Sequence, residues 1–323
     1  MNRVLLAKCV REARLLFLAC FAALFLFCFF RMYIVSRVEM DSFAKIVGEL
    51  WDKWSDFSPV SLKQLLSYPG RVAITFDEPI VLLCITIFAI ARGSDCISGE
   101  LGRGTMEMLL AQPLSRWQIV VTQATVTVYG LAILSLAVWT GMTAGVHTFK
   151  TLEEGPQPSY RVPGLHVTIP IPWAKPKREW VPLSKMVQAE DFVPATLNLF
   201  AFGVCLSGVA TCLSAFDRYR WRTIGITVGL YVVQMMVKLA ATAVPEMKWL
   251  NAWTIFSAYQ PQKIVERAVH APETVWSLAI FDASGHFTTL GPIGCDLILL
   301  GIGGIGYLIA VVKFSQRDIP APL

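Results

Sequence analysis

Long apolar runs, separated by shorter polar segments, dominate this chain of 323 residues. A helix needs roughly 20 mostly apolar residues to cross the hydrocarbon layer of a membrane. About six segments meet this requirement. We predict membrane-spanning helices near residues 15–35, 76–95, 118–145, 193–216, 222–244 and 291–312. The third and fourth are the clearest, because neither run contains an Asp, Glu, Lys or Arg.

The second predicted span is the shortest. Its uncharged stretch, Pro79 to Ala91, covers only about 20 Å at the helical rise per residue. Asp77, Glu78 and Pro79 suit the first turn of a helix, where acids favour the helix dipole and proline needs no hydrogen-bond acceptor. We therefore keep this span and predict an all-α polytopic membrane protein. Residues 1–323 would form a single transmembrane domain with sizeable extracytoplasmic loops.

Composition supports a membrane protein. Apolar residues make up 55% of the chain and charged residues 16%, and the mean hydropathy is +0.56. A soluble domain would carry about a quarter charged residues. The N-terminal apolar run lacks a small-x-small cleavage site and is followed by Arg31, so we interpret it as a retained span rather than a signal peptide. The eight cysteines include no C-x-x-C pair, and we interpret them as small apolar packing residues.

The distribution of charge predicts the orientation. Lys and Arg concentrate in residues 1–14, 92–118, 217–222 and the tail from Lys313. The positive-inside rule then places these segments and both termini in the cytoplasm. We predict an interfacial helix or small cap within 36–75, extended structure in the proline-rich 150–190 segment, and short interfacial helices in 245–290.

The segment after the second span has its own pattern of helix breakers and caps. Gly99, Gly102 and Gly104 are expected to interrupt the helix that leaves the membrane. Thr105 is the expected N-cap of a new helix of about two turns, Met106 to Ala111. This short helix would lie across the cytoplasmic face.

The apolar side of that short helix carries Met106, Leu109 and Leu110. An apolar side bounded by charge on a water-exposed loop suggests a docking surface for a partner, and the alternative is a helix that lies on lipid headgroups. Pro113 would end the helix. Ser115 to Gln118 forms an S-x-x-Q capping box that would begin the third span.

Residues 98–120, SGELGRGTMEMLLAQPLSRWQIV, resemble the loop of ABC-2-type ABC transporter permeases, whose pattern is roughly E-R-E-x-G-T-L-E-x-L-L-x-x-P-V-S-R. The matching residues are Glu100, Gly104, Thr105, Glu107, Leu109, Leu110, Pro113, Ser115 and Arg116. The basic N-terminal segment, the six-span order and the Arg-Asp tail also resemble that family, so the likeness covers essentially the whole chain. Gly102-Arg103 and Gln123 depart from its usual residues.

The resemblance implies the permease subunit of an ABC exporter in the cytoplasmic (inner) membrane of a bacterium. An ABC-type ATPase on a separate chain would bind ATP and Mg, and a second permease chain, identical or paralogous, would complete the path through the lipid bilayer. Loop 96–117 would carry the cytoplasmic coupling helix. The implied ATPase-contacting residues are Glu100, Arg103, Gly104, Thr105, Met106, Glu107, Leu109, Leu110, Pro113, Ser115 and Arg116. The substrate is not indicated, and the outer loops leave room for an extracytoplasmic accessory protein.

The sequence gives no sign of catalysis in this chain. It contains no G-x-x-x-x-G-K-[ST] motif, and GELGRGT lacks the phosphate-binding lysine. No His, Cys and acid cluster has metal-ligand spacing, so we expect no metal, no cofactor and no enzyme activity here, and no nucleic-acid partner. GIGGIG, residues 301–306, mimics a dinucleotide fingerprint but lies in an apolar span, where small residues let helices pack closely.

Lys238 and Asp296 lie inside predicted spans, several residues from their outer ends. Lys238 and Asp296 have matching depths, which suggests an ion pair in the outer leaflet, and the alternative is that each snorkels separately. Asn198 and Gln234 could line a path or hold helices together. A self-sufficient secondary transporter or channel would need charges near the membrane midplane, and a membrane-embedded enzyme would need converging catalytic groups. The spans carry almost none of either.

Overall fold

The computed structural model describes residues 2–38, 62–154, 159–161, 168–170, 178–281 and 286–317. Within these residues, 6 helical segments are long and apolar enough to cross a membrane, as predicted. They contain α1 (Arg3–Arg37), α5 (Pro79–Ser94), α8 (Arg116–Thr148), α9 (Val193–Phe216), α10 (Arg220–Ala243) and α12 (Pro292–Gln316). The second predicted span is confirmed, and α5 begins with Glu78 as N-cap and Pro79 in its first turn.

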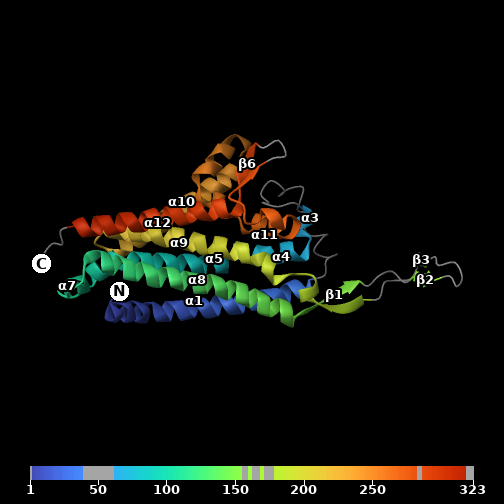
Figure 1. Ribbon diagram of the computed structural model, residues 1–323, viewed down its shortest axis with the longest axis horizontal. Coiled ribbons are helices and arrows are strands. Elements are labelled where there is room, and N and C mark those ends of the chain that lie inside the picture. The colour runs from blue at the N-terminus through green and yellow to red at the C-terminus, as the bar shows by residue number, and fades with distance from the viewer. Residues whose placement is uncertain are drawn as a thin grey trace.

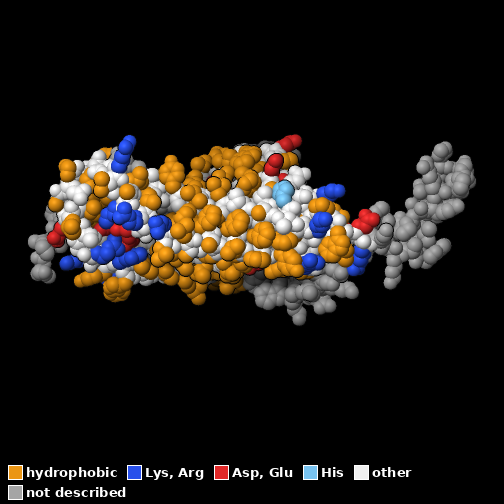
Figure 2. All heavy atoms as spheres, turned by 90° about the horizontal axis from the view of Figure 1, so that it is seen from below, with side chains coloured by type: hydrophobic (Ala, Val, Ile, Leu, Met, Phe, Trp, Pro, Cys, Tyr) orange, Lys and Arg blue, Asp and Glu red, His pale blue; other side chains and the backbone are white. Residues whose placement is uncertain are grey.

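Helices α1, α5, α8, α9 and α12 run side by side along the long axis, and α10 lies against the outside of the bundle (Figure 1). The start of α1, the end of α12 and the short α7 (Thr105–Leu110) lie at one end, which we call the terminal end. The opposite end carries α4 (Tyr68–Ala73) and α11 (Pro261–His270). Hydrophobic side chains cover the middle of the face seen in Figure 2. Lys and Arg form their largest group at the terminal end, and a smaller number lie at the opposite end.

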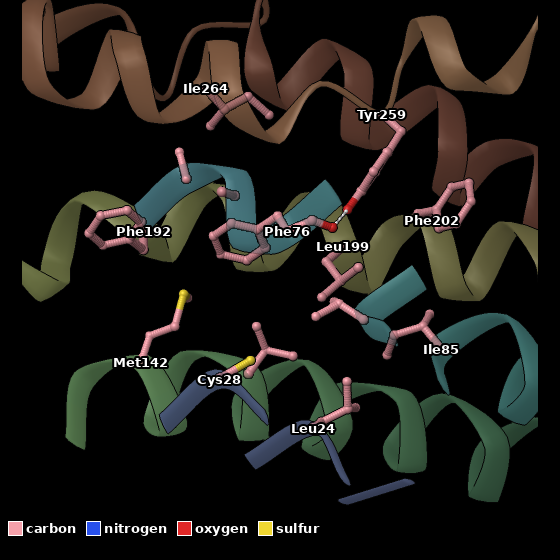
Figure 3. Packing of buried hydrophobic residues seen from close by; sticks show 14 of the residues in the cluster. Leu24, Cys28, Phe76, Ile85, Met142, Phe192, Leu199, Phe202, Tyr259 and Ile264 are labelled. Carbon is pink, nitrogen blue, oxygen red and sulfur yellow. Dashed lines mark hydrogen bonds between the residues drawn. The ribbon is translucent and has the colours of Figure 1, made fainter. Parts of the chain in front are cut away.

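The core lies between α9 and the helices around it. Leu199 and Phe202 of α9 belong to one buried cluster with Ile85 of α5, and Leu24 of α1 lies beside α8 (Figure 3). All four side chains are fully buried. At the opposite end, the Tyr259 hydroxyl donates to the Phe76 carbonyl at 2.8 Å, so the segment before α11 is fixed to the start of the second span.

Small residues allow α9 and α12 to touch along their backbones. A Cβ at Gly208 would lie 2.2 Å from the Gly303 carbonyl oxygen, and one at Gly306 would lie 2.6 Å from the Gly208 carbonyl oxygen. The GIGGIG segment is thus a packing surface, as the sequence predicted.

The shorter elements are joined to the ends of the long helices. They include α3 (Leu62–Leu65), η2 (Ile74–Asp77), η4 (Leu183–Lys185), η5 (Ala189–Phe192), η6 (Pro245–Trp253), η7 (Ile255–Ser257) and η8 (Pro272–Thr274). Three antiparallel pairs complete the fold: β1 (Lys150–Glu154) with β4 (Arg178–Pro182), β2 (Ser159–Arg161) with β3 (Thr168–Pro170), and β5 (Ala279–Phe281) with β6 (Phe287–Leu290).

These elements test the loop predictions. Strands occupy described residues between 150 and 182, as predicted, whereas η4 and η5 make residues 183–185 and 189–192 helical. Short helices occupy parts of 245–274, as predicted, and β5 and β6 follow them. Most of the segment predicted to form an interfacial helix or cap, 39–61, lies outside the described residues.

Candidate functional site

The helix that leaves the second span does not stop at Gly99, which corrects the sequence prediction. It continues as a π-helical turn, η3 (Asp95–Gly99), and then as α6 (Glu100–Gly102). A π turn displaces backbone N–H groups from their usual acceptors. Ser214 Oγ of α9 accepts hydrogen bonds from the backbone N–H groups of Ile97 at 3.1 Å and Ser98 at 2.8 Å. The wide turn is therefore held by a neighbouring helix.

Gly99 has a different role from the one predicted. A Cβ at this position would lie 2.1 Å from Asp95 Oδ1. The missing side chain leaves room for a buried carboxylate, and the glycine does not break the helix.

Two buried acids, Asp95 and Glu100, form the centre of a group that we call the ionic cluster. Its cations are Lys8, Arg92, Arg103 and Arg220. Glu100 is fully buried, and its Oε1 accepts from Lys8 Nζ at 2.5 Å and lies 3.3 Å from Arg103 Nη2. Lys8 lies on α1, so this acid connects the first span to the loop.

Asp95 binds three guanidinium groups. Its carboxylate lies 2.7 Å from Arg103 Nη1, 3.3 Å from Arg220 Nη1 and 3.5 Å from Arg92 Nη1. The hydrogen bond with Asp95 is the largest of the effects that raise the pKa of Arg103 above its usual value. Because Arg220 begins α10 and Arg92 belongs to α5, one carboxylate joins two spans and the loop.

The short helix α7 begins one residue earlier than the sequence suggested. Gly104, with a φ of 71°, is the N-cap, and Thr105 is the first helical residue. The left-handed conformation favours glycine. Thr105 Oγ1 donates to the Glu100 carboxylate and, at 3.3 Å, to the Glu100 carbonyl. Thr105 therefore connects α7 to the ionic cluster. It is not the N-cap of α7, which corrects the sequence prediction.

The apolar side of α7 is not available to a partner. Met106 and Leu109 are 1% and 7% exposed and pack with Leu5, Phe314 and neighbouring residues of the same chain, and Leu110 packs at the edge of this cluster. The predicted apolar docking surface is therefore wrong, because the chain itself covers it. The outward side presents Glu107 and Met108, and Met108 is 72% exposed.

The remaining predicted loop residues connect α7 to the next spans. Pro113 and Ser115 are exposed, and the Ser115 N–H donates to Gln118 Oε1 at 3.2 Å as the capping box requires. Arg116 Nη1 donates to the carbonyls of Phe314, at 3.4 Å, and Arg317. Arg116 thus binds the C-terminal end of α12, where helix carbonyls lack helical partners.

Sequence reasoning missed most of the ionic cluster. Lys8, Arg92 and Arg220 belong to the basic segments that predicted the orientation, and no contact was predicted for them. Asp95 was not singled out, although it is an acid beside a long apolar run. Met108 was missed because the docking surface was predicted on the side of α7 that is buried. Arg103, in contrast, is half exposed and belongs both to the cluster and to the outer surface.

The predicted ion pair between Lys238 and Asp296 does not form. Lys238 Nζ donates to Asn251 Oδ1 at 2.8 Å, and Asp296 Oδ1 accepts from Asn198 Nδ2 at 2.7 Å. Each charged side chain instead forms a hydrogen bond with the side-chain amide of an asparagine. Asn198 also donates to the Ala258 carbonyl, and Gln234 Oε1 accepts from the Ile255 N–H. These two amides therefore hold segments together.

The comparison with known families agrees with this architecture. The family described as "ABC-2 family transporter protein" matches residues 6–318, nearly the whole chain. The chain belongs to the ABC-2 transporter family. This family places it among the membrane permeases of ABC transporters, which generally work with an ABC ATPase. A comparison with curated proteins gave no match.

Proposed function

We propose that this ABC-2 protein is the permease subunit of an exporter in the bacterial cytoplasmic membrane. ATP and Mg would be bound by a separate ATPase chain, and this chain would have neither enzyme activity nor a cofactor of its own. Both termini, and α7 with them, would face the cytoplasm. The concentration of Lys and Arg at the terminal end supports this orientation.

The proposal rests on the difference in burial between the two sides of α7. Its inner side is buried in the chain's own core, whereas Glu107 and Met108 point outward. A short helix that is fixed on one side and free on the other can transmit a push from a partner. We therefore place the ATPase contact on Glu107, Met108 and the exposed atoms of Arg103.

The ionic cluster supports a route for that push. Glu100 contacts α1 through Lys8, and Asp95 contacts α5 through Arg92 and α10 through Arg220. Movement of α7 would then displace three spans together, as alternating access requires. Salt bridges with buried acids resist separation, because an uncompensated buried charge is costly.

A second permease chain is part of the proposal. In the most apolar stretch of α10, 11% of residues are buried, against 72% in that of α9. The exposed surface of α10 is the place where we expect the second chain, whether an identical copy or a paralogue.

The experiment compares two double variants of the full chain, each coexpressed with candidate ABC ATPase chains from the same genome. Glu107→Lys/Met108→Asp changes the outward side of α7. The control, Glu246→Lys/Met247→Asp, makes the same changes at exposed residues of the opposite end. We expect the first variant to weaken copurification of the ATPase roughly tenfold or more, because a charge would replace an exposed apolar anchor.

The control should copurify as wild type does. Equal copurification by both variants, with normal membrane insertion, would refute the α7 contact. If wild type copurified no ATPase at all, a self-sufficient transporter or channel would become the better proposal.

A further inference from the structure

A cavity of about 380 Å³ lies at the opposite end, away from the ionic cluster. It is bounded by α11, by the segment just before it, by β6 and by the start of α12. Its volume falls in the range of about 300–1,000 Å³ typical of small-molecule sites. Because α12 begins at Pro292, the cavity lies at the end of a span, where lipid headgroups would lie.

The charged groups in the cavity wall are all positive. Lys263 and Arg267 line it, and no acid does. They stand four residues apart on α11, so they share one side of that helix and repel each other. Among the described residues, neither forms a salt bridge, and Arg267 Nη2 donates to Thr289 Oγ1 at 3.4 Å. The nearby Asp296 already accepts from Asn198.

The rest of the wall is apolar and partly open to the outside. Phe287, Leu290 and Ile298 line the cavity and are 60%, 42% and 42% exposed. Ile298 belongs to the membrane-spanning part of α12, so the apolar wall continues toward the region of lipid chains. A soluble anion would use the two cations but would leave this wall in contact with water.

We propose that this cavity binds the phosphate headgroup of an anionic membrane lipid, with Lys263 and Arg267 on the phosphate and the apolar wall on the upper part of an acyl chain. Arginine and lysine are both phosphate ligands, and arginine adds a two-pronged hydrogen bond. This inference does not depend on the ATPase contact at α7. The net positive wall favours an anionic lipid over a neutral or zwitterionic one.

The test uses the full chain in detergent and native mass spectrometry. The probes are phosphatidylglycerol, phosphatidylcholine with the same acyl chains, and inorganic phosphate as a competitor. We expect wild type to bind phosphatidylglycerol roughly tenfold or more tightly than phosphatidylcholine, because two cations face the headgroup. Lys263→Gln/Arg267→Gln should remove that preference, and Lys263→Arg/Arg267→Lys should keep it.

The matched control removes another pair of basic residues four positions apart, Arg218→Gln/Arg222→Gln, at the terminal end. It should retain the preference. An unchanged preference in the Lys263→Gln/Arg267→Gln variant, or an equal loss in the control, would overturn the site. Full displacement of the lipid by an equal concentration of inorganic phosphate would overturn the lipid assignment. The size-exclusion profile of each variant confirms that a loss of binding is not a loss of folding.

Discussion

The two ends of the bundle differ in how their charged side chains are paired. At the terminal end, two buried carboxylates bring together four cations from three spans and the loop. At the opposite end, Lys238 and Asp296 are each held by a neutral amide, and Lys263 and Arg267 have no acidic partner among the described residues. The first arrangement binds helices to one another. The second leaves positive charge available to a ligand.

This difference has a physical cause. A buried carboxylate is stable only if cations or donors surround it, so Asp95 and Glu100 fix the positions of every group around them. An amide partner satisfies hydrogen bonding without neutralising the charge. We therefore expect substitutions at the terminal end to be costly and those at the opposite end to be mild. The expected loss of stability decreases from Glu100, through Gly99, to the Lys238 and Asp296 pair.

Replacement of the buried acid should have the largest effect. Glu100→Ala removes the carboxylate shared by Lys8, Arg103 and Thr105 and empties a fully buried site. We therefore expect a loss of about 3 kcal/mol in the free energy of unfolding. Glu107→Ala, seven residues later on the outward side of α7, should change it by less than about 0.5 kcal/mol. Thermal and denaturant unfolding of the purified protein in detergent measures both. Similar losses for the two variants would show that the cluster does not stabilise the fold.

A methyl group at Gly99 should have an intermediate effect. Its Cβ would meet the Asp95 carboxylate at 2.1 Å, and overpacking of this kind costs about 1–3 kcal/mol. Gly225→Ala in α10 is the matched control, because nothing lies within 4 Å of its Cβ. There, alanine should stabilise the helix by up to about 1 kcal/mol. The same unfolding assay measures both variants. An unchanged free energy of unfolding in Gly99→Ala would mean that the Asp95 side chain can move to make room for the methyl group.

The smallest effect is expected between Lys238 and Asp296. Since these side chains do not contact each other, Lys238→Gln and Asp296→Asn should combine additively, with a coupling free energy within about 0.5 kcal/mol of zero. A double-mutant cycle on stability measures it. Charge reversal at both positions should likewise bring no recovery over the single reversals. A coupling well above 1 kcal/mol would restore the ion pair that the sequence suggested.

The sequence was a good guide to the spans and a poor guide to contacts. The ends of α9 were predicted to the residue, because its uncharged run is bounded by Asp191 and Asp217. The packing role of Gly303 and Gly306 was also predicted, since small residues in an apolar helix have few other uses. Thr105 as N-cap was wrong by one residue, because Gly104 adopts the left-handed conformation that the cap needs.

The contacts of the candidate site were also poorly predicted from the sequence. Loop 96–117 was located from its motif, yet Met106 and Leu109 were assigned to a partner surface. Periodicity shows that these residues share one side of α7, but it cannot show which surface covers that side. Leu5 and Phe314, near opposite ends of the chain, cover it.

The sequence by itself determined the number and positions of the membrane-spanning helices, because the cost of placing charged groups in hydrocarbon acts on each segment separately. It also marked the loop, through its glycines and caps. Only the tertiary structure decided which charges pair, which side of α7 is free, and where a cavity with a positive wall opens. Those outcomes depend on groups far apart in the chain, such as Lys8 and Glu100, meeting at about hydrogen-bond distance, and no local pattern records that meeting.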